Sequence, residues 1–191
     1  MLIGVILVSM LLDILVGLLV LLVGAIAMTG VFYCFTMVPY VPTSSKVSRQ
    51  MVDFAGLKGG ETVYDLGAGD ARLLIEAKRV HRGITAKGYE ISPVVYLLGL
   101  YHVRRSKLPI HFSFGNFFHR DVSDADCIFL YLMPEVMGKL AEKFDRELKP
   151  GTKVISNVFR FKDRSPVGTR EVEWISGKRK LWMYEWPAKS S

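Results

Sequence analysis

Residues 63–72 read VYDLGAGDAR, and the rest of the chain can be placed around them. The run opens with apolar residues typical of a short buried strand and breaks at Gly67 and Gly69. Apolar residues then recur at helical spacing, at Leu73, Leu74, Ala77 and Val80. A strand that leads through a glycine-rich turn into a helix is a cradle for a nucleotide cofactor, because the turn exposes backbone N–H groups and lets the backbone approach the ligand.

The acidic residues of this turn narrow the choice of cofactor. Asp65 opens the turn and Asp70 follows its second glycine, where a bound pyrophosphate would add negative charge. Because like charges repel, a dinucleotide is disfavoured, and a cofactor with a cationic centre and an amino-acid tail fits better. The pattern D-x-G-x-G resembles motif I of the class I, seven-strand methyltransferases, which use S-adenosylmethionine. Taken alone, it also fits an ordinary turn between a strand and a helix.

The N-terminal segment has the composition of a membrane span. Residues 1–38 contain one charge, Asp13, and the uncharged run that follows it is long enough to cross a bilayer. A cleaved signal peptide, the main alternative, would need a basic start and a shorter apolar core, but no Lys or Arg precedes Lys46. A buried core helix of this length is also disfavoured. Because basic residues follow the span, we expect a single-pass protein with its catalytic domain on the cytoplasmic or equivalent organellar side.

The remainder of the chain divides into a link and one domain. The 191 residues carry a net charge of +7, and the excess of basic residues lies after the span, which favours an anionic membrane surface or a nucleic acid as partner. Two prolines stiffen the link, and Ser44 or Ser45 caps a helix that ends near Gly56. We therefore predict an anchor (1–38), a link with its helix (39–58) and a methyltransferase domain (59–191). Cys34 and Cys127 lie in apolar runs without a Cys/His cluster, so neither a disulfide nor a metal site is predicted.

Further strand-like runs follow at regular intervals. Residues 86–90 form a second strand ending in Glu90, near the spacing at which a carboxylate grips ribose hydroxyls, although a solvated strand end is the plain alternative. Runs at 111–114, 126–132 and 153–158 predict three more strands, with helices between them. Residues 171–175 and 180–186 flank a hairpin turn at 176–179. The predicted fold class is α/β, a Rossmann-like seven-strand sheet with a C-terminal antiparallel hairpin, preceded by one transmembrane helix.

Several motifs together indicate a narrower family. The chain combines the anchor with VPYVPT, DLGAGDAR, GYEISP and LYLMPE. This combination is similar to the small membrane-anchored protein-lysine methyltransferases that modify the mitochondrial ATP synthase c-subunit and the adenine nucleotide translocase. One departure is Ala71, where that family commonly has a third glycine. The resemblance implies S-adenosylmethionine as cofactor, bound by Asp65, Gly67, Ala68, Gly69, Asp70, Glu90, Ile91, Asn116 and Phe117, with Asn116 on the adenine amino group and Phe117 against the ring.

The substrate side is expected just beyond the fourth strand, where Tyr131 and Glu135 follow its carboxyl end. A lysine must lose a proton before it can attack a methyl group, and Glu135 is our candidate to accept it. Glu135 is equally explained as an acid in the first turn of a helix. The resemblance implies a membrane protein as substrate, whereas a lipid or quinone substrate and a non-enzymatic scaffold are the alternatives. Enzymes that methylate nucleic-acid amino groups usually carry N/D-P-P-Y/F here, and residues 133–135 read MPE, so we expect no nucleic-acid substrate.

Overall fold

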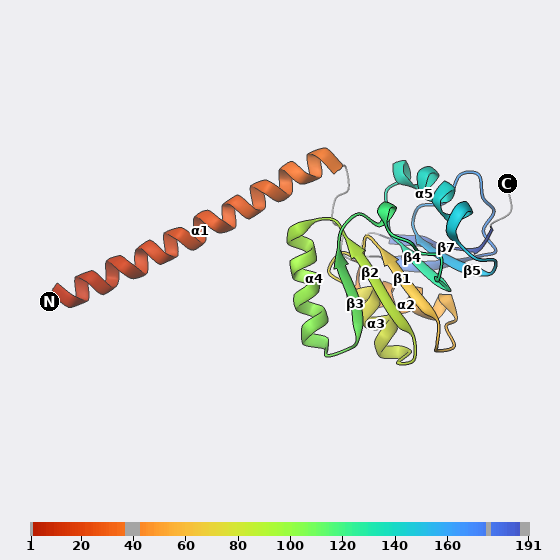
Figure 1. Cartoon of the computed structure of the whole chain (residues 1–191), viewed down its shortest axis with the longest axis horizontal. Helices are drawn as coiled ribbons and strands as arrows, with labels where there is room; N and C mark the ends of the chain where they lie inside the picture. Colours follow the sequence, from red (N-terminus) through yellow and green to blue (C-terminus); the bar gives the residue numbers. More distant parts are fainter. Residues whose placement is uncertain (1, 37–42, 175–176, 188–191) are drawn as a thin grey trace. The chain divides into compact units, whose positions relative to one another are not determined.

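The computed structural model describes residues 2–36, 43–174 and 177–187, and the chain divides into two compact units, residues 1–39 and 40–191. The first unit is one helix, α1 (Leu2–Thr36), drawn in red and orange in Figure 1. Residues Ile6–Met28 have a mean hydropathy of 3.0 and no share of them is buried, so by length and composition this helix can cross a membrane. The predicted proline link at 39–42 lies outside the described residues.

The second unit is built on a seven-stranded sheet with the order β3-β2-β1-β4-β5-β7-β6 (Figure 1). The first five strands in this order are parallel, whereas β7 pairs antiparallel with both β5 and β6. The predicted fold class is confirmed. The strands are β1 (Thr62–Leu66), β2 (Thr85–Glu90), β3 (Ile110–Phe114), β4 (Cys127–Leu130), β5 (Thr152–Asn157), β6 (Gly168–Trp174) and β7 (Gly177–Trp186).

Several predicted boundaries are wrong, among them the start of β6, which is Gly168 and not residue 171. β4 ends at Leu130, two residues early, because its neighbour β1 turns away after Leu66, the partner of Leu130. The turn predicted at 176–179 is wrong, because β7 begins at Gly177 and already includes Lys178 and Arg179, whereas residues 175–176 lie outside the described residues. In this ladder Glu173 lies opposite Lys178, and such cross-strand pairs of opposite charge favour pairing over a longer loop.

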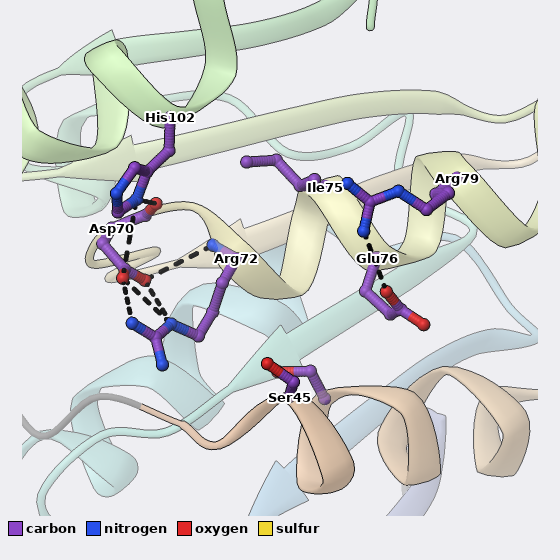
Figure 2. A pocket seen from close by; sticks show the side chains of 8 residues that line it. Ser45, Asp70, Arg72, Ile75, Glu76, Arg79 and His102 are labelled. Atoms are coloured by element: carbon purple, nitrogen blue, oxygen red, sulfur yellow. Dashed lines mark hydrogen bonds and ion pairs between the residues drawn. The ribbon is translucent and has the colours of Figure 1, made fainter. Parts of the chain in front are cut away.

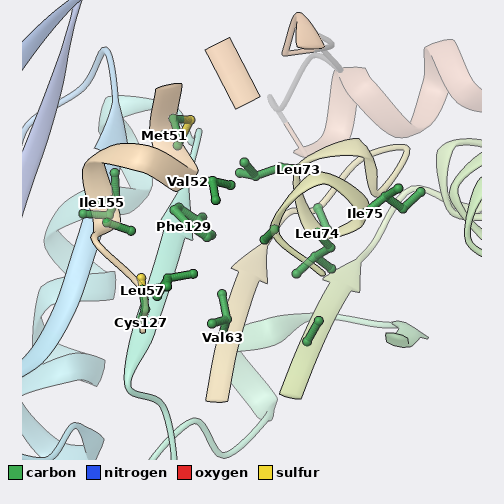
Figure 3. Close-up of a cluster of buried hydrophobic side chains, with 14 of the residues drawn as sticks. Met51, Val52, Leu57, Val63, Leu73, Leu74, Ile75, Cys127, Phe129 and Ile155 are labelled. Atoms are coloured by element: carbon green, nitrogen blue, oxygen red, sulfur yellow. The ribbon is translucent and has the colours of Figure 1, made fainter. Parts of the chain in front are cut away.

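Helices cover both faces of the sheet: α2 (Ser45–Ala55), α3 (Arg72–Val80), α4 (Pro93–Ser106), the short η1 (Phe117–His119) and α5 (Pro134–Glu147). Side chains of α2 and α3 form one core with β1, β4 and β5, in which Met51, Val52 and Leu74 pack toward Phe129 and Ile155 (Figure 3). A second core joins α5 to the opposite face of the sheet through Leu140 and Phe144. Burial of these apolar faces supplies the main driving force for the layered arrangement.

The topology of the sheet brings the carboxyl ends of its parallel strands together. The carboxyl ends of the five parallel strands β1 to β5 meet at one edge of the sheet, and the start of β7 lies at this edge because β7 runs antiparallel to β5. Ligands of open α/β sheets bind at this edge. All the residues that the sequence predicted for the site lie at or shortly after the carboxyl ends of these parallel strands.

Candidate functional site

The glycine turn after β1 is fixed by β2. The N–H groups of Gly67 and Ala68 donate to the carbonyl oxygen of Tyr89 at 3.0 and 2.9 Å. Gly67 and Gly69 have φ angles of 77° and 58°, in the left-handed region, and a Cβ on Gly67 would lie 2.9 Å from Leu132 Cδ2. The left-handed conformation therefore favours glycine at Gly67, and a Cβ there would also displace the end of the Leu132 side chain.

Glu90, at the end of β2, connects this turn to the next helix. Its Oε2 accepts a hydrogen bond from the Gly69 N–H at 2.8 Å, and its Oε1 accepts one from the Ser92 N–H, also at 2.8 Å. The residue is 8% exposed. Each carboxylate oxygen has lone pairs left, so Glu90 can hold the turn and still accept hydrogen bonds from ribose hydroxyls.

Three buried acids surround the turn, and two of them, Asp65 and Glu90, form no ion pair with another described residue, whereas Asp70 pairs with Arg72. Burial, followed by the nearby carboxylates of Glu90 and Asp70, raises the pKa of Asp65 to about 8. Burial also raises the pKa of Glu90. A cation brought into this site would stabilise the ionised carboxylates, so the site fits a cofactor with a sulfonium and an amino group better than one with a pyrophosphate.

Asp70 faces the helices. Its carboxylate accepts hydrogen bonds from Arg72 Nε at 2.9 Å and lies 3.6 Å from His102 Nδ1 (Figure 2). Arg72 in turn donates to the carbonyl oxygen of Thr43 at 3.1 Å. Asp70 therefore ties the cofactor turn to the start of α2, beside a pocket of about 280 Å³ between α2, α3 and α4. Direct contact of Asp70 with the cofactor stays a prediction.

The remaining predicted cofactor residues lie at the same edge. Ile91 is half-buried directly after Glu90. Asn116 is half-buried and caps η1, where its Oδ1 accepts from the Phe118 N–H at 3.0 Å. The ring of Phe117 is 8% exposed and belongs to the second core, with Phe118 at 4.7 Å between ring centroids. The amide group of Asn116 thus keeps hydrogen-bonding capacity for an adenine, whereas Phe117 mainly packs in the core.

The predicted substrate residues have different environments. Tyr131 is half-buried, its hydroxyl accepts from Arg179 Nη1 at 2.7 Å, and its ring lies 6.1 Å from that of Trp174. Arg179 also lies over the Trp174 ring at 4.2 Å, so β4 and the hairpin meet at the substrate side. Glu135 is exposed in the first turn of α5. Tyr131 is the more enclosed of the two candidates.

Sequence reasoning missed Asn157 at the end of β5. Its side chain is fully buried, and neither Oδ1 nor Nδ2 has a hydrogen-bond partner among the described residues. Buried amides are usually paired, so an unpartnered one at a ligand-binding edge is a candidate site residue, although a ligand would reach its two polar atoms only after the side chains that cover them move. A polar residue at the carboxyl end of a buried strand is the signal that identifies Asp65 and Glu90, and it is present here as well.

The backbone after Asn157 is strained. Val158 has a φ angle of 71°, and the Phe159 N–H donates to the Asn157 carbonyl oxygen at 2.9 Å, which closes a three-residue turn. This conformation is rare for a β-branched residue and is found where surrounding structure enforces it, often at functional sites. Trp182 Nε1 helps to hold it by donating to the Val158 carbonyl oxygen at 2.9 Å. The described residues include no cluster of three metal-ligating side chains.

Comparisons with known proteins agree with this geometry. The family model described as ANTKMT methyltransferase domain matches residues 65–168. A protein-lysine N-methyltransferase of Saccharolobus islandicus (strain REY15A) is 34% identical over 149 residues, which cover 77% of this chain and 92% of that protein. The human lysine N-methyltransferase of the ATP synthase c-subunit is 29% identical over 130 residues, 67% of this chain and only 54% of the human protein.

A solved structure is similar at the level of the fold and of the sequence. The RNA methyltransferase from Salinibacter ruber, crystallised with S-adenosyl-L-homocysteine, superposes with a TM-score of 0.69 at 31% identity. The match covers 76% of this chain and 93% of the Salinibacter chain. The predicted fold, enzyme class and cofactor are therefore supported independently of the motifs.

Proposed function

The chain belongs to the ANTKMT methyltransferase family and is an S-adenosylmethionine-dependent methyltransferase. From this premise we propose that it methylates lysine side chains of a membrane protein. We also propose that α1 anchors the enzyme in the same bilayer as this substrate. The proposal of a lysine substrate rests on the buried amide of Asn157, which has no hydrogen-bond partner among the described residues. Leu130 of β4 and Ser156 of β5 lie opposite each other in the sheet, so Asn157 and Tyr131, the next residue of each segment, lie at the same level. A polar and enclosed site is suited to the amino group at the end of one flexible lysine side chain. The names of the relatives support the same substrate class.

The roles of the residues follow from their chemistry. When bound, S-adenosylmethionine supplies an electrophilic methyl group on a sulfonium sulfur. Gly67, Gly69 and Glu90 would hold this cofactor, and Asp65 would face its positive charge. The free lone pair of the Tyr131 hydroxyl can accept an N–H group of the substrate amine and orient the amine's own lone pair, and Asn157 Oδ1 would accept another once the side chains that close it off from solvent move.

The substrate must also arrive uncharged. Enclosure of the amine beside Trp174 and Tyr131 would disfavour its ammonium form and lower the pKa of the lysine. We propose that Glu135, which is exposed in the first turn of α5, accepts the released proton, or that water does so directly. The enzyme therefore needs alignment and desolvation more than a strong buried base.

The membrane part of the proposal rests on α1 and on charge. The helix, in which Asp13 is the single charged residue, is long enough to cross a bilayer, and Lys46 and Arg49 follow it, which favours the domain on the cytoplasmic or equivalent organellar side. A short link then confines the site to the neighbourhood of the bilayer. Substrates in that bilayer are met at a high effective concentration.

An RNA substrate is the second candidate, because the Salinibacter neighbour is described as an RNA methyltransferase and the domain is basic. One experiment separates the two. The full-length chain, reconstituted in vesicles, is given cofactor with a labelled methyl group together with membrane proteins and total RNA. We expect label on a lysine of a membrane protein, and label in RNA would overturn the proposal.

The same assay tests the site. Asn157→Leu keeps the volume of the side chain but removes its polar atoms, so methyl transfer should fall at least tenfold while affinity for the cofactor stays within twofold. Ser113→Ala, a change at an exposed position of β3, is the matched control and should leave transfer unchanged. Normal transfer by Asn157→Leu would show that Asn157 does not contact the substrate.

A further inference from the structure

One helix of the domain exposes its apolar side. Val94, Leu97, Leu98 and Tyr101 of α4 recur at helical spacing, and they are 37%, 63%, 42% and 56% exposed. The opposite side of α4 packs on the sheet through Val95, Gly99 and Val103. The four exposed residues therefore form a continuous stripe along the helix, which we call the α4 apolar face. An apolar stripe at this spacing normally faces a protein core.

This face holds four of the seven large apolar side chains that are exposed among the described residues after α1, and Phe114 is a fifth. Phe114 ends β3 and packs on Tyr96 of α4, with the ring centroids 5.5 Å apart. Concentration of exposed apolar residues in one place indicates an interaction surface.

Basic residues lie at the C-terminal end of α4, beside the α4 apolar face. Arg104, Arg105 and Lys107 are exposed at the C-terminal end of α4, and the helix contains no acidic residue. Arg105 Nη1 donates to the Tyr101 hydroxyl at 3.1 Å, which joins the basic end to the apolar face. None of these three residues forms an ion pair with another described residue. An apolar face with basic residues beside it is the composition of a helix that lies in a membrane interface.

We propose that the α4 apolar face docks into the boundary between head groups and acyl chains of an anionic bilayer, with Arg104, Arg105 and Lys107 on the lipid phosphates. The inference rests on the proposed anchoring by α1. Only eight residues separate the end of α1 at Thr36 from the start of α2 at Ser45, so they span roughly 30 Å at most, and a bilayer that holds α1 is always within reach of the domain. Docking thus needs only weak intrinsic affinity.

The test uses the full chain with a probe on the proposed face. Leu97→Cys carries a nitrobenzoxadiazole label in a chain that also has Cys34→Ser and Cys127→Ala, and Glu142→Cys on the exposed side of α5 is the matched control. Vesicles contain equal amounts of phosphatidylcholine and phosphatidylserine, with a nitroxide on the acyl chains. We expect emission from position 97 to shift to the blue and to be quenched severalfold more than emission from position 142, and the difference to shrink in phosphatidylcholine alone.

Insertion of the anchor is measured separately, by flotation and by resistance to carbonate extraction. If the chain floats with the vesicles but the probe at position 97 stays as exposed to water as the probe at position 142, the docking proposal is wrong and the anchoring proposal is still supported. If the chain does not float with the vesicles, the anchoring proposal fails and this inference fails with it. A blue shift at position 97 without quenching by the lipid nitroxide would mean that a protein, such as a second copy, covers the face, and would overturn the proposal.

Discussion

At the scale of single residues, Asp65 couples the cofactor site to pH. Its pKa rises from 3.8 to about 8 in the folded chain without cofactor, because it is buried beside Glu90 and Asp70. The folded state therefore holds a proton that the unfolded state releases, so this contribution to stability is complete below pH 4 and is lost as the pH rises through about 8. We expect the unfolding free energy to fall across this window, and Asp65→Asn to flatten the fall.

The same residue predicts proton release on binding. S-adenosylmethionine has one more positive charge than S-adenosylhomocysteine, so it should lower the pKa of Asp65 further and release more protons near neutral pH. Calorimetric titrations in buffers of different ionisation enthalpy measure the number released. Equal proton release for both ligands would contradict the role given to Asp65.

Ala71 makes a second residue-scale prediction. It occupies the position where the related enzymes commonly have glycine, and it adopts a φ angle of 63°. A left-handed conformation costs a residue with a Cβ roughly 1–2 kcal/mol, part of which is offset because glycine loses more entropy on folding. Ala71→Gly should therefore stabilise the domain by up to about 1 kcal/mol, measured by denaturant unfolding. A clear loss of stability would mean that the buried methyl group contributes more packing than the conformation costs.

The site residues also show what the sequence can predict at this scale. Asp65 and Glu90 can be identified because an acid at the end of an apolar strand is conspicuous, and Gly67 because the turn requires it. Asn157 and Arg179 cannot be placed so easily. Their positions depend on the register of β5 and β7, which pairs residues more than twenty positions apart in the sequence. The direction of Asp70 toward Arg72 likewise depends on how α2 and α4 pack.

At the scale of elements, two glycines in two helices predict opposite effects of the same substitution. A Cβ on Gly99 of α4 would lie 2.6 Å from Phe112 Cε1 and 2.9 Å from the Gly69 carbonyl oxygen, whereas one on Gly138 of α5 meets nothing within 4 Å. Gly99→Ala should destabilise the domain by about 1–3 kcal/mol, as overpacking does, and Gly138→Ala should stabilise it by about 0.5–1 kcal/mol. Denaturant unfolding of the two variants measures both changes.

Gly99→Ala should also weaken cofactor binding, because α4 packs directly on the cofactor turn. Calorimetric titration should show at least a fivefold loss of affinity for S-adenosylhomocysteine, and no change for Gly138→Ala. Unchanged affinity in a destabilised Gly99→Ala would show that the turn is held by Glu90 and Tyr89 alone.

The boundaries of helices and strands can be predicted from the sequence only where local residues determine them. Strands with apolar runs and helices with caps, such as α2 with Ser44 and Gly56, are predictable close to their observed bounds. The end of β4 and the hairpin turn are not, since both are set by where a neighbouring strand ends. The sequence predicts α4 only as an ordinary apolar helix, because periodicity alone does not tell which side of a helix meets the sheet.

At the scale of the whole molecule, the anchor should set the rate at which the target is methylated and leave the cofactor site alone. The residues that hold the cofactor turn, Glu90, Tyr89 and Arg72, make their described contacts within the second unit. That unit also contains both cores of the domain. Deletion of residues 1–38 should therefore leave cofactor affinity within about twofold, while labelling of the native target in membranes falls at least tenfold through the loss of effective concentration.

Lengthening the link between the anchor and the domain tests whether methylation depends on holding the domain close to the bilayer or only on attaching it there. Insertion of a flexible Gly/Ser segment of about thirty residues after Val38 keeps the chain on the membrane but lets the domain move further from it, so the effective concentration falls gradually with tether length. Methylation of the membrane target should drop to a value between those of the intact and truncated chains, and a rigid proline-rich insert of equal length should reduce it further. The confinement model is wrong if the truncated chain labels its native target as fast as the anchored one, or if the labelled product is a soluble molecule.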